Sequence, residues 1–520
     1  MPPVAAPQSR QKRSERFLGS VLWSWFGVAV SIFSGLLLSP YTIHKLGPEG
    51  YGVWTVIFAF VDYLWLLDLG FRSATLKYTA HYLALGQTDK IIEVLNTGVL
   101  YATAISAVTI VATVFLAGYV SRFENISPPY QRPFTILLIV VGIGWASGAV
   151  FNLFSASLEG FQRFDLTSRI WITSIAVRSF GIAAVLAAGH RLLAMGAVVL
   201  LSLALTYSLS YFSLRRIFPQ FQFSPRKASF AMFRQMLAYG IHTFLAFISQ
   251  QLLNQSPPIL IAHFLPTAYA GYYGMAMRVP NYSVDLVNRV GLISGSHAAE
   301  LAARNDLSAI ARMGICTNRY CLTMFAPMAI AMVVYGRELF RVWISPEFAA
   351  ISAPLLPVLA IGITLGVAAQ FNSSSILYGL GKHPGYAKSL MVEAILCVAG
   401  VYLVLPRYQI LGAAYITAIL MVINRGLFTA WLLSRAVKYS FPAYLWGIYG
   451  MPTLVAIPVL LGAQWMKLHW LQGNNWRQII AGGTALTIAY YAAAYFLCLE
   501  KQHRHLPVRW IRTRLGIAAA

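Results

Sequence analysis

The stretch "SPYTIHKLGPEGYGVW", residues 39 to 54, returns later in the chain as "PPILIAHFLPTAYAGYY", residues 257 to 273. The two stretches align without a gap at a shift of 218 residues. Their identical positions are Pro40 and Pro258, Ile43 and Ile261, Pro48 and Pro266, and Tyr51 and Tyr269. A match at this distance predicts that the protein is built from two related halves.

Two further pairs of segments keep nearly the same spacing. "LEGFQRFDLTSR" (158 to 169) matches "LYGLGKHPGYAK" (377 to 388), and "RLLAMGA" (191 to 197) matches "RYQILGA" (407 to 413). The shift covers six predicted helices, an even number, so the halves have the same orientation in the membrane. We therefore expect two parallel six-helix lobes, V-shaped around a central cleft.

Composition sets the class of protein. The chain is 58% hydrophobic and 11% charged, with a mean hydropathy of +0.64, which leaves too few polar side chains to cover a water-soluble globule. Apolar runs of about 20 residues, enough to cross a bilayer, recur from 17 to 39 through 479 to 498. The sequence predicts an all-α polytopic membrane protein with about fourteen transmembrane helices. The first run is too long for a cleaved signal peptide and is expected to remain as the first span.

The positive charge follows the predicted topology. The formal net charge is +23, and 25 of the 39 Lys and Arg residues fall on segments that share a side with the N-terminus, against nine on the opposite segments. This bias obeys the positive-inside rule. It predicts that both termini are cytoplasmic, that the protein lies in the cytoplasmic membrane, and that nucleic acid is not its partner.

The predicted spans and connections divide the chain into six parts. No connection is long enough to form a soluble domain, and the basic linker is expected to contact anionic lipid headgroups. The parts are an N-terminal cytoplasmic tail (1–16), a first transmembrane lobe (17–213), a cytoplasmic basic linker (214–236), a second lobe (237–434), two additional transmembrane helices (435–498) and a basic cytoplasmic tail (499–520).

One predicted span carries unusual charge. "GMAMRVPNYSVDLVNRVGLI", residues 274 to 293, contains Arg278, Asp285 and Arg289, and each ionised side chain near mid-bilayer costs about 2.5 to 3.5 kcal/mol on insertion scales. Asp285 and Arg289 are four residues apart and can neutralise each other. Arg278 has no obvious partner in its own helix, and Pro280 is expected to kink that helix beside a cavity.

Arg319 is expected to lie at the interface, and four more charged residues fall inside predicted spans: Arg178, Arg425, Asp62 and Glu393. Cations therefore outnumber anions, and the sequence predicts a weakly electropositive cleft. The candidate substrate-binding residues are Arg178, Asp285, Arg278, Arg289 and Arg425. Asp62 and Glu393 are candidate coupling or structural acids. An alternative stays open, in which Arg178 and Arg425 pair with Glu393 or Asp62 to hold helices together. Asp68 is expected to be structural, because it lies near the end of a span and Arg72 follows four residues later.

Enzyme and metal signatures are missing from the sequence. There is no Gly-rich phosphate loop, no H-E-x-x-H and no G-x-S-x-G, and the four cysteines show no C-x-x-C spacing. We expect no metal site, no cofactor and no enzymatic activity. A membrane glycan polymerase or ligase would carry a sizeable polar loop between spans, and a cation-coupled multidrug antiporter would carry surplus acids in its lobes.

Several segments together resemble a known family. "SPYTIHKLGPEGYGVW", "LLDLGF" (66 to 71), "LEGFQRFDL" (158 to 166), "LYGLGK" (377 to 382) and "LVLPRYQILGAAYITAI" (403 to 419) are similar, in order, to segments of the polysaccharide transporter branch of the multidrug/oligosaccharidyl-lipid/polysaccharide flippase superfamily. The resemblance covers about residues 17 to 435. Gln409 departs from it, because the family usually has Gly there.

The resemblance implies a two-lobed bundle that translocates undecaprenyl-diphosphate-linked oligosaccharide across the cytoplasmic membrane. Such transport serves the assembly of O-antigen, capsule or exopolysaccharide. Membrane lipids and other polysaccharide-assembly proteins are the further expected partners. An electropositive cleft suits this substrate, because a diphosphate accepts guanidinium forks well.

Overall fold

The structure is a computed structural model that describes residues 10–120, 126–500 and 503–504 of the chain. Within these ranges the structure leaves some side chains undescribed. They belong to residues 10–22, 24–25, 65, 67, 241–243, 245–246, 285–293, 296 and 368–369. All secondary-structure elements of the described residues are helices. The chain divides into two compact units, Met1–Gly271 and Tyr272–Ala520.

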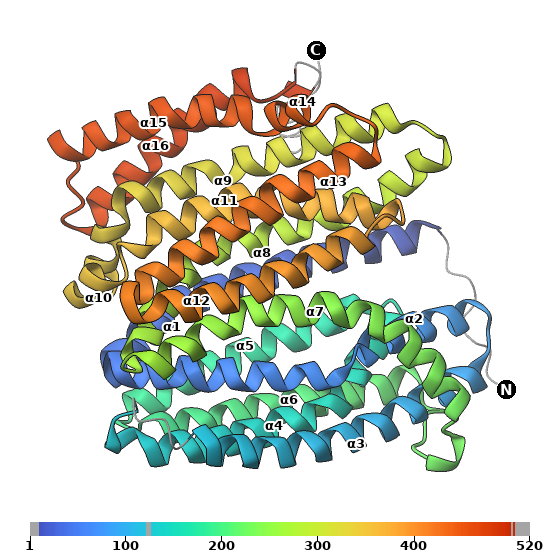
Figure 1. Cartoon of the computed structure of the whole chain (residues 1–520). Helices are drawn as coiled ribbons and strands as arrows, with labels where there is room; N and C mark the ends of the chain where they lie inside the picture. Colours follow the sequence, from blue (N-terminus) through green and yellow to red (C-terminus); the bar gives the residue numbers. More distant parts are fainter. Residues whose placement is uncertain (1–9, 121–125, 501–502, 505–520) are drawn as a thin grey trace. The chain divides into compact units, whose positions relative to one another are not determined.

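The first unit consists of long helices that run across the view in Figure 1. In chain order they are α1 (Arg10–Leu64), the short 3-10 helix η1 (Trp65–Asp68), α2 (Phe71–Ala84), α3 (Thr88–Val120), α4 (Pro128–Gly160), α5 (Phe164–Ala187), α6 (Leu192–Ile217), η2 (Pro225–Lys227) and α7 (Phe230–Phe264). Helix α4 packs on α3 and α6, and α1 packs on α5 and α7.

The basic linker is fastened to the core of the first unit. Phe221 is buried in a cluster with Phe71 and Leu95. The Asn96 side chain on α3 accepts a hydrogen bond from the Ser224 amide at 2.7 Å and donates to the Gln222 carbonyl at 3.4 Å. Because the buried Asn96 side chain forms hydrogen bonds with two backbone groups of the linker, this segment is held against α3.

The second unit also consists of helices. In chain order they are α8 (Ala268–Ala303, which begins before the boundary), α9 (Leu307–Trp343), α10 (Pro346–Ile351), α11 (Leu355–Gly379), α12 (Pro384–Leu420), the π-helix η3 (Met421–Phe428), α13 (Thr429–Ala436), α14 (Phe441–Leu445), the π-helix η4 (Trp446–Gly450), α15 (Met451–His469) and α16 (Trp476–Leu497). Helix α9 packs on α10, α11, α15 and α16.

The internal repeat is visible in the backbone. Residues with positive φ separate successive helices at Gly86, Gln162 and Gly189, and again 219 or 220 residues later at Asn305, Gly381 and Gln409. Positive φ is uncommon outside glycine, so three matched occurrences are specific to a repeated chain path. The repeat predicted from the sequence is therefore present as a chain path that recurs in the second half of the chain.

The segments that begin at Pro40 and Pro258 break at equivalent places. Helix α1 is interrupted at Gly47 (φ 76°, ψ 169°), and α7 ends at Leu265 (φ −130°, ψ 159°), 218 residues later. Each break precedes a proline, Pro48 or Pro266, and the residue before a proline prefers an extended conformation. Both segments are therefore helix–turn–helix elements.

A glycine makes the same contact in both repeats. A Cβ atom on Gly160 at the end of α4 would lie 3.0 Å from the Leu76 carbonyl oxygen on α2, and one on Gly379 at the end of α11 would lie 2.3 Å from the Gly295 carbonyl oxygen on α8. Only glycine allows backbones to approach this closely. The recurrence of glycine at these two positions of the repeat is therefore explained by the close packing of the backbones.

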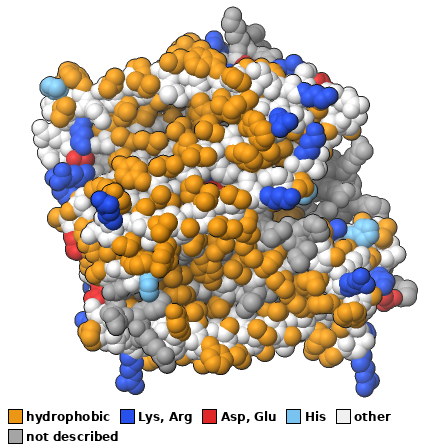
Figure 2. All heavy atoms as spheres, viewed as in Figure 1, with side chains coloured by type: hydrophobic (Ala, Val, Ile, Leu, Met, Phe, Trp, Pro, Cys, Tyr) orange, Lys and Arg blue, Asp and Glu red, His pale blue; other side chains and the backbone are white. Residues whose placement is uncertain are grey.

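The described helices have membrane dimensions. Ten are long and apolar enough to cross a bilayer, and two of these stretches, Phe26–Leu64 and Pro384–Ala436, contain the breaks at Gly47 and Gln409. Figure 2 shows hydrophobic side chains over most of the visible face, with most Lys and Arg toward the ends of the helices. The all-α polytopic architecture is confirmed, while the number fourteen stays a prediction. The predicted lobe boundaries also stay predictions.

Candidate substrate and coupling residues in the membrane helices

Asp62 on α1 lies against a polar stretch of α7 in the first unit. The Gln255 side chain donates to Asp62 Oδ2 at 2.9 Å, and the Gln251 side chain donates to the Asp62 carbonyl at 2.9 Å. The neighbouring Tyr63 hydroxyl bonds to the Ser256 hydroxyl. Among the described residues no Lys, Arg or His comes within 4.0 Å of the Asp62 carboxylate, so its side-chain partner is a neutral amide.

Arg178 on α5 is half-buried. Helix α5 packs on α1 and α6, and the Ser179 hydroxyl next in sequence bonds to Ser34 on α1. The ion pairs of the described residues do not join Arg178 to Asp62.

Arg425 and Glu393 form a buried ion pair in the second unit. Arg425 Nε donates to Glu393 Oε1 at 2.8 Å, and the Asn424 side chain donates to Glu393 Oε2 at 2.7 Å. The two charged side chains are 4% and 0% exposed. Both carboxylate oxygens therefore have donors, and the pair joins α12 to the π-helix η3. This geometry favours the helix-locking alternative for Arg425 over direct contact with substrate.

Two polar atoms near this pair have no protein hydrogen-bond partner among the described residues. They are Arg425 Nη2 and Gln370 Oε1. The Gln370 amide nitrogen donates to the Tyr386 hydroxyl at 2.6 Å, and α11, which carries Gln370, packs on η3. Buried polar atoms of this kind are usually satisfied by ordered water.

Arg278 on α8 differs from Arg425 in its exposure. Its side chain is exposed, and its Nε donates to the Tyr282 hydroxyl one turn later at 3.2 Å. Helix α8 continues through Pro280. The guanidinium is therefore held on the face of a membrane-length helix and is accessible.

Asp285 and Arg289 lie on α8, but their side chains lie outside the described residues. Their mutual neutralisation, and their contact with substrate, stay predictions. The connection at 120–133 includes residues 121–125, which are also outside the description.

Asp68 contacts Arg72 through the backbone of Arg72 and not through its side chain. Arg72 Nη2 donates to Glu159 on α4 at 2.7 Å, whereas Asp68 Oδ2 accepts from the Arg72 backbone amide at 3.3 Å. Asp68 lies in η1 and caps the start of α2, so its carboxylate satisfies a helix N-terminus. Arg72 is thereby left to join α2 to α4.

The sequence reasoning missed two polar layers. One is the glutamine face of α7 that meets Asp62, and the signal for it is the polar spacing in "SQQLLNQS" (249 to 256). The other joins three helices of the second unit: Ser294 donates to Asn372 at 2.9 Å, and Asn318 donates to Ser373 at 2.9 Å. The run "FNSSS" (371 to 375) within an apolar segment marks it in the sequence.

Comparison with protein families gives one match that covers more than half of the chain. Residues 18–288 match the family described as polysaccharide biosynthesis protein. The chain belongs to this family.

Curated relatives of this polysaccharide biosynthesis protein are membrane proteins. It is 20% identical to the uncharacterised membrane protein EpsK of Bacillus subtilis, with 94% of this chain and 96% of the relative covered. It is 21% identical to a putative O-antigen transporter of Shigella flexneri, with 80% of this chain and 97% of the relative covered.

Solved structures of transporters share the fold of this family member. The lipid II flippase MurJ, in an inward closed conformation, has a TM-score of 0.68 at 13% identity and covers 92% of this chain and 99% of its own. An inward-facing multidrug resistance transporter of the MATE family has a TM-score of 0.61 at 13% identity, covering 79% and 95%. At these identities the likeness shows the fold alone.

Proposed function

We propose that this protein is a flippase that moves an oligosaccharide linked to a lipid diphosphate across the cytoplasmic membrane by alternating access. The glycan would then enter a cell-surface polysaccharide such as O-antigen, capsule or exopolysaccharide. Membership of the polysaccharide biosynthesis protein family supports this proposal, as does the similarity to a putative O-antigen transporter. Two parallel repeats suit a transporter in which one half rocks against the other.

The exposed guanidinium of Arg278 carries the proposal. A charged side chain at membrane depth is stable only beside protein, other polar groups or water, and accessibility on a spanning helix suits a residue of a translocation path. A guanidinium presents a planar fork that matches phosphate oxygens. In this proposal Arg278 contacts the diphosphate, and Tyr282 orients its fork.

The other predicted site residues take different parts. Arg178 is half-buried and is proposed to line the cleft, and Asp285 with Arg289 is proposed to extend the polar face of α8. Arg425 is assigned to the structural pair with Glu393, because its side chain is only 4% exposed and offers no accessible fork to a substrate.

Asp62 is the acid that we assign to coupling. Its side-chain hydrogen-bond donor is the neutral Gln255, so its charge can change without breaking an ion pair among the described residues. Protonation of Glu393, in contrast, would leave the charge of Arg425 buried without a counter-ion. The central cleft, the cytoplasmic location of both termini and contacts with other assembly proteins are parts of the same proposal.

Complementation of a flippase-deleted host tests the role of Arg278. Arg278→Ala is expected to reach the membrane at wild-type abundance and to lose transport, and Arg278→Lys to recover part of it, since an ammonium cannot form a bidentate fork. Arg304→Ala is the matched control, because Arg304 follows the same helix but pairs with Glu300 on an exposed surface. Full complementation by Arg278→Ala would remove Arg278 from the translocation path.

The same strains separate the alternative functions. A cation-coupled multidrug antiporter would change drug resistance and leave the surface glycan unaltered. A polymerase or ligase would leave translocated but unpolymerised lipid-linked glycan on the outer leaflet when the gene is removed. Accumulation of lipid-linked glycan on the cytoplasmic leaflet is the result that the flippase proposal requires.

A further inference from the structure

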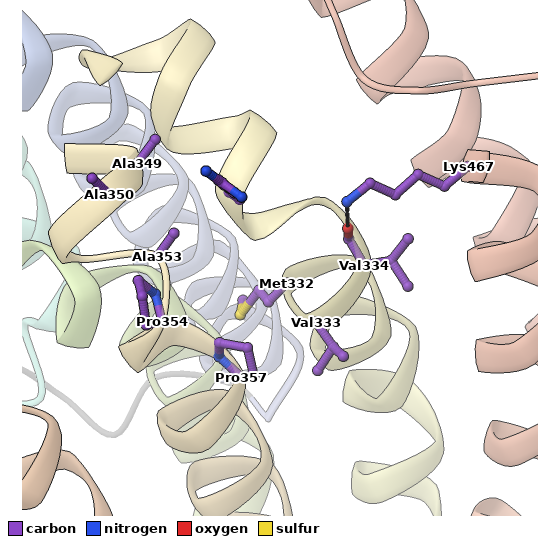
Figure 3. Close-up of a pocket in the computed structure, with 10 residues that line it drawn as sticks. Met332, Val333, Val334, Ala349, Ala350, Ala353, Pro354, Pro357 and Lys467 are labelled. Atoms are coloured by element: carbon purple, nitrogen blue, oxygen red, sulfur yellow. Dashed lines mark hydrogen bonds between the residues drawn. The ribbon is translucent and has the colours of Figure 1, made fainter. Parts of the chain in front are cut away.

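The second unit contains a cavity of about 430 Å³ between α9, α10, α11 and α15. Figure 3 shows aliphatic side chains on its walls and Lys467 reaching toward α9 from α15. Two cations, Arg337 and Lys467, also line it. The aliphatic lining includes Met332, Val333, Ala349, Ala353, Pro354 and Pro357.

The two cations differ in their partners. Lys467 Nζ donates to the Val334 carbonyl at 2.5 Å and to Glu338 Oε2 at 2.7 Å, so its charge is neutralised within the wall. Arg337 is exposed and makes no hydrogen bond or ion pair with any residue that the structure describes. The guanidinium of Arg337 is therefore the uncompensated charge of the cavity.

Aromatic residues place this cavity at the level of lipid headgroups. Trp465 and Trp470 flank Lys467 on and just after α15, with ring centroids 4.9 Å apart, and both are more than half exposed. Leu461 and Leu468 on the same helix are also exposed. Tryptophan gathers at the boundary between hydrocarbon and headgroups, so the cavity opens beside that boundary.

We propose that this cavity binds one anionic phospholipid of the surrounding bilayer. An acyl chain would lie along the aliphatic wall, and the phosphate would bind the guanidinium of Arg337. Three properties support this occupant. The volume falls in the range of ligand sites, the aliphatic part of the wall favours an acyl chain over water, and a guanidinium pairs with phosphate through two parallel hydrogen bonds.

The assignment is independent of the proposed transport activity. A phosphate with a long apolar chain is the chemistry that the walls and Arg337 recognise, and both bilayer phospholipids and polyprenyl phosphates have it. We commit to the phospholipid because the cavity adjoins the exposed apolar face of α15, where bilayer lipid is the abundant neighbour.

Native mass spectrometry of the full chain in mild detergent tests the assignment. Wild-type protein is expected to retain one phosphatidylglycerol under conditions that remove phosphatidylethanolamine. Arg337→Gln should weaken that retention about tenfold, as the loss of one charge-assisted pair implies. Arg341→Gln is the matched control, since Arg341 lies one turn later on α9 and donates to Asn474 at 3.2 Å instead of lining the cavity.

A second variant tests the apolar wall. Ala350, which is exposed and lines the cavity, can be changed to Phe to occupy the space of the acyl chain, and Ala104→Phe on an exposed face of α3 controls for added bulk. Ala350→Phe should lower phosphatidylglycerol retention while Ala104→Phe leaves it unchanged. Gel filtration and melting temperature without added lipid establish that both variants fold.

Four results would overturn the assignment. Equal retention of the zwitterionic and anionic lipids would show that Arg337 does not select charge. Wild-type retention in both Arg337→Gln and Ala350→Phe would place the lipid elsewhere. Displacement of phosphatidylglycerol by an equimolar polyprenyl phosphate would assign the cavity to the substrate's lipid, and displacement by inorganic phosphate alone would exclude a role for the acyl chain.

Discussion

Replacing Gln409 by Gly should stabilise the protein. Gln409 has φ 49° and ψ −148° at the break inside α12, a conformation that only glycine adopts without strain. Holding another residue there costs about 1 to 3 kcal/mol, and glycine loses about 0.5 to 1 kcal/mol more chain entropy on folding. The difference predicts a net gain of roughly 1 kcal/mol for Gln409→Gly.

The first repeat supports this expectation. Gly189, 220 residues earlier, occupies the equivalent break with φ 81°. The Gln409 side chain is exposed and makes no described hydrogen bond, so removing it loses no contact. The relief of backbone strain therefore determines that Gln409→Gly raises the free energy of unfolding.

The assay is the apparent melting temperature of purified protein in detergent, followed by tryptophan fluorescence. Gln464→Gly is the matched control, because Gln464 is exposed in the regular helix α15 and the same substitution there should cost about 0.5 to 1 kcal/mol. The two variants should shift in opposite directions. A fall in melting temperature for Gln409→Gly equal to that of Gln464→Gly would refute the strain at this break.

Three more predictions follow from other contacts. Glu393→Gln should destabilise the fold by about 3 to 5 kcal/mol by stranding Arg425, and adding Arg425→Met should restore much of the membrane abundance, as quantified by immunoblot. Gly379→Ala should lower membrane abundance, because the added Cβ atom would clash with the Gly295 carbonyl oxygen at a cost of about 1 to 3 kcal/mol. Wild-type abundance of this variant would contradict the close approach of the two backbones. The Ala309 amide lowers the pKa of Asp306, the N-cap of α9. Its stabilising contribution is present above the unfolded pKa and is lost as the pH falls through the lower folded pKa. Asp306→Asn should flatten this acid dependence of the melting temperature, and an unchanged profile would refute it.

The architecture could be predicted because its signals are local or repeated. Apolar runs show the spans, and the 218-residue shift shows the two halves, since both depend on residue spacing alone. The break before Pro48 follows from the conformational preference of its preceding residue. These features need no knowledge of which helices touch.

Side-chain partners could not be predicted in the same way. Helical spacing places Arg72 one turn after Asp68, but the Arg72 side chain pairs with Glu159 on α4, 87 positions along the chain. The sequence left open whether Arg425 contacts the substrate or Glu393, because the way α12 and η3 pack determines which of their faces meet. Spacing within one helix does not determine contacts between helices.

The π-helix that carries Arg425 changes the helical phase of its span. A π-helical segment accommodates about one more residue than an α-helix of the same length, and one residue in an α-helix corresponds to about 100° of rotation. The side chains of α13 are therefore turned, relative to an unbroken continuation of α12, toward different neighbours. Insertion of a single residue in an ancestral helix would account for this segment, and its removal would rotate everything that follows without shortening the span appreciably.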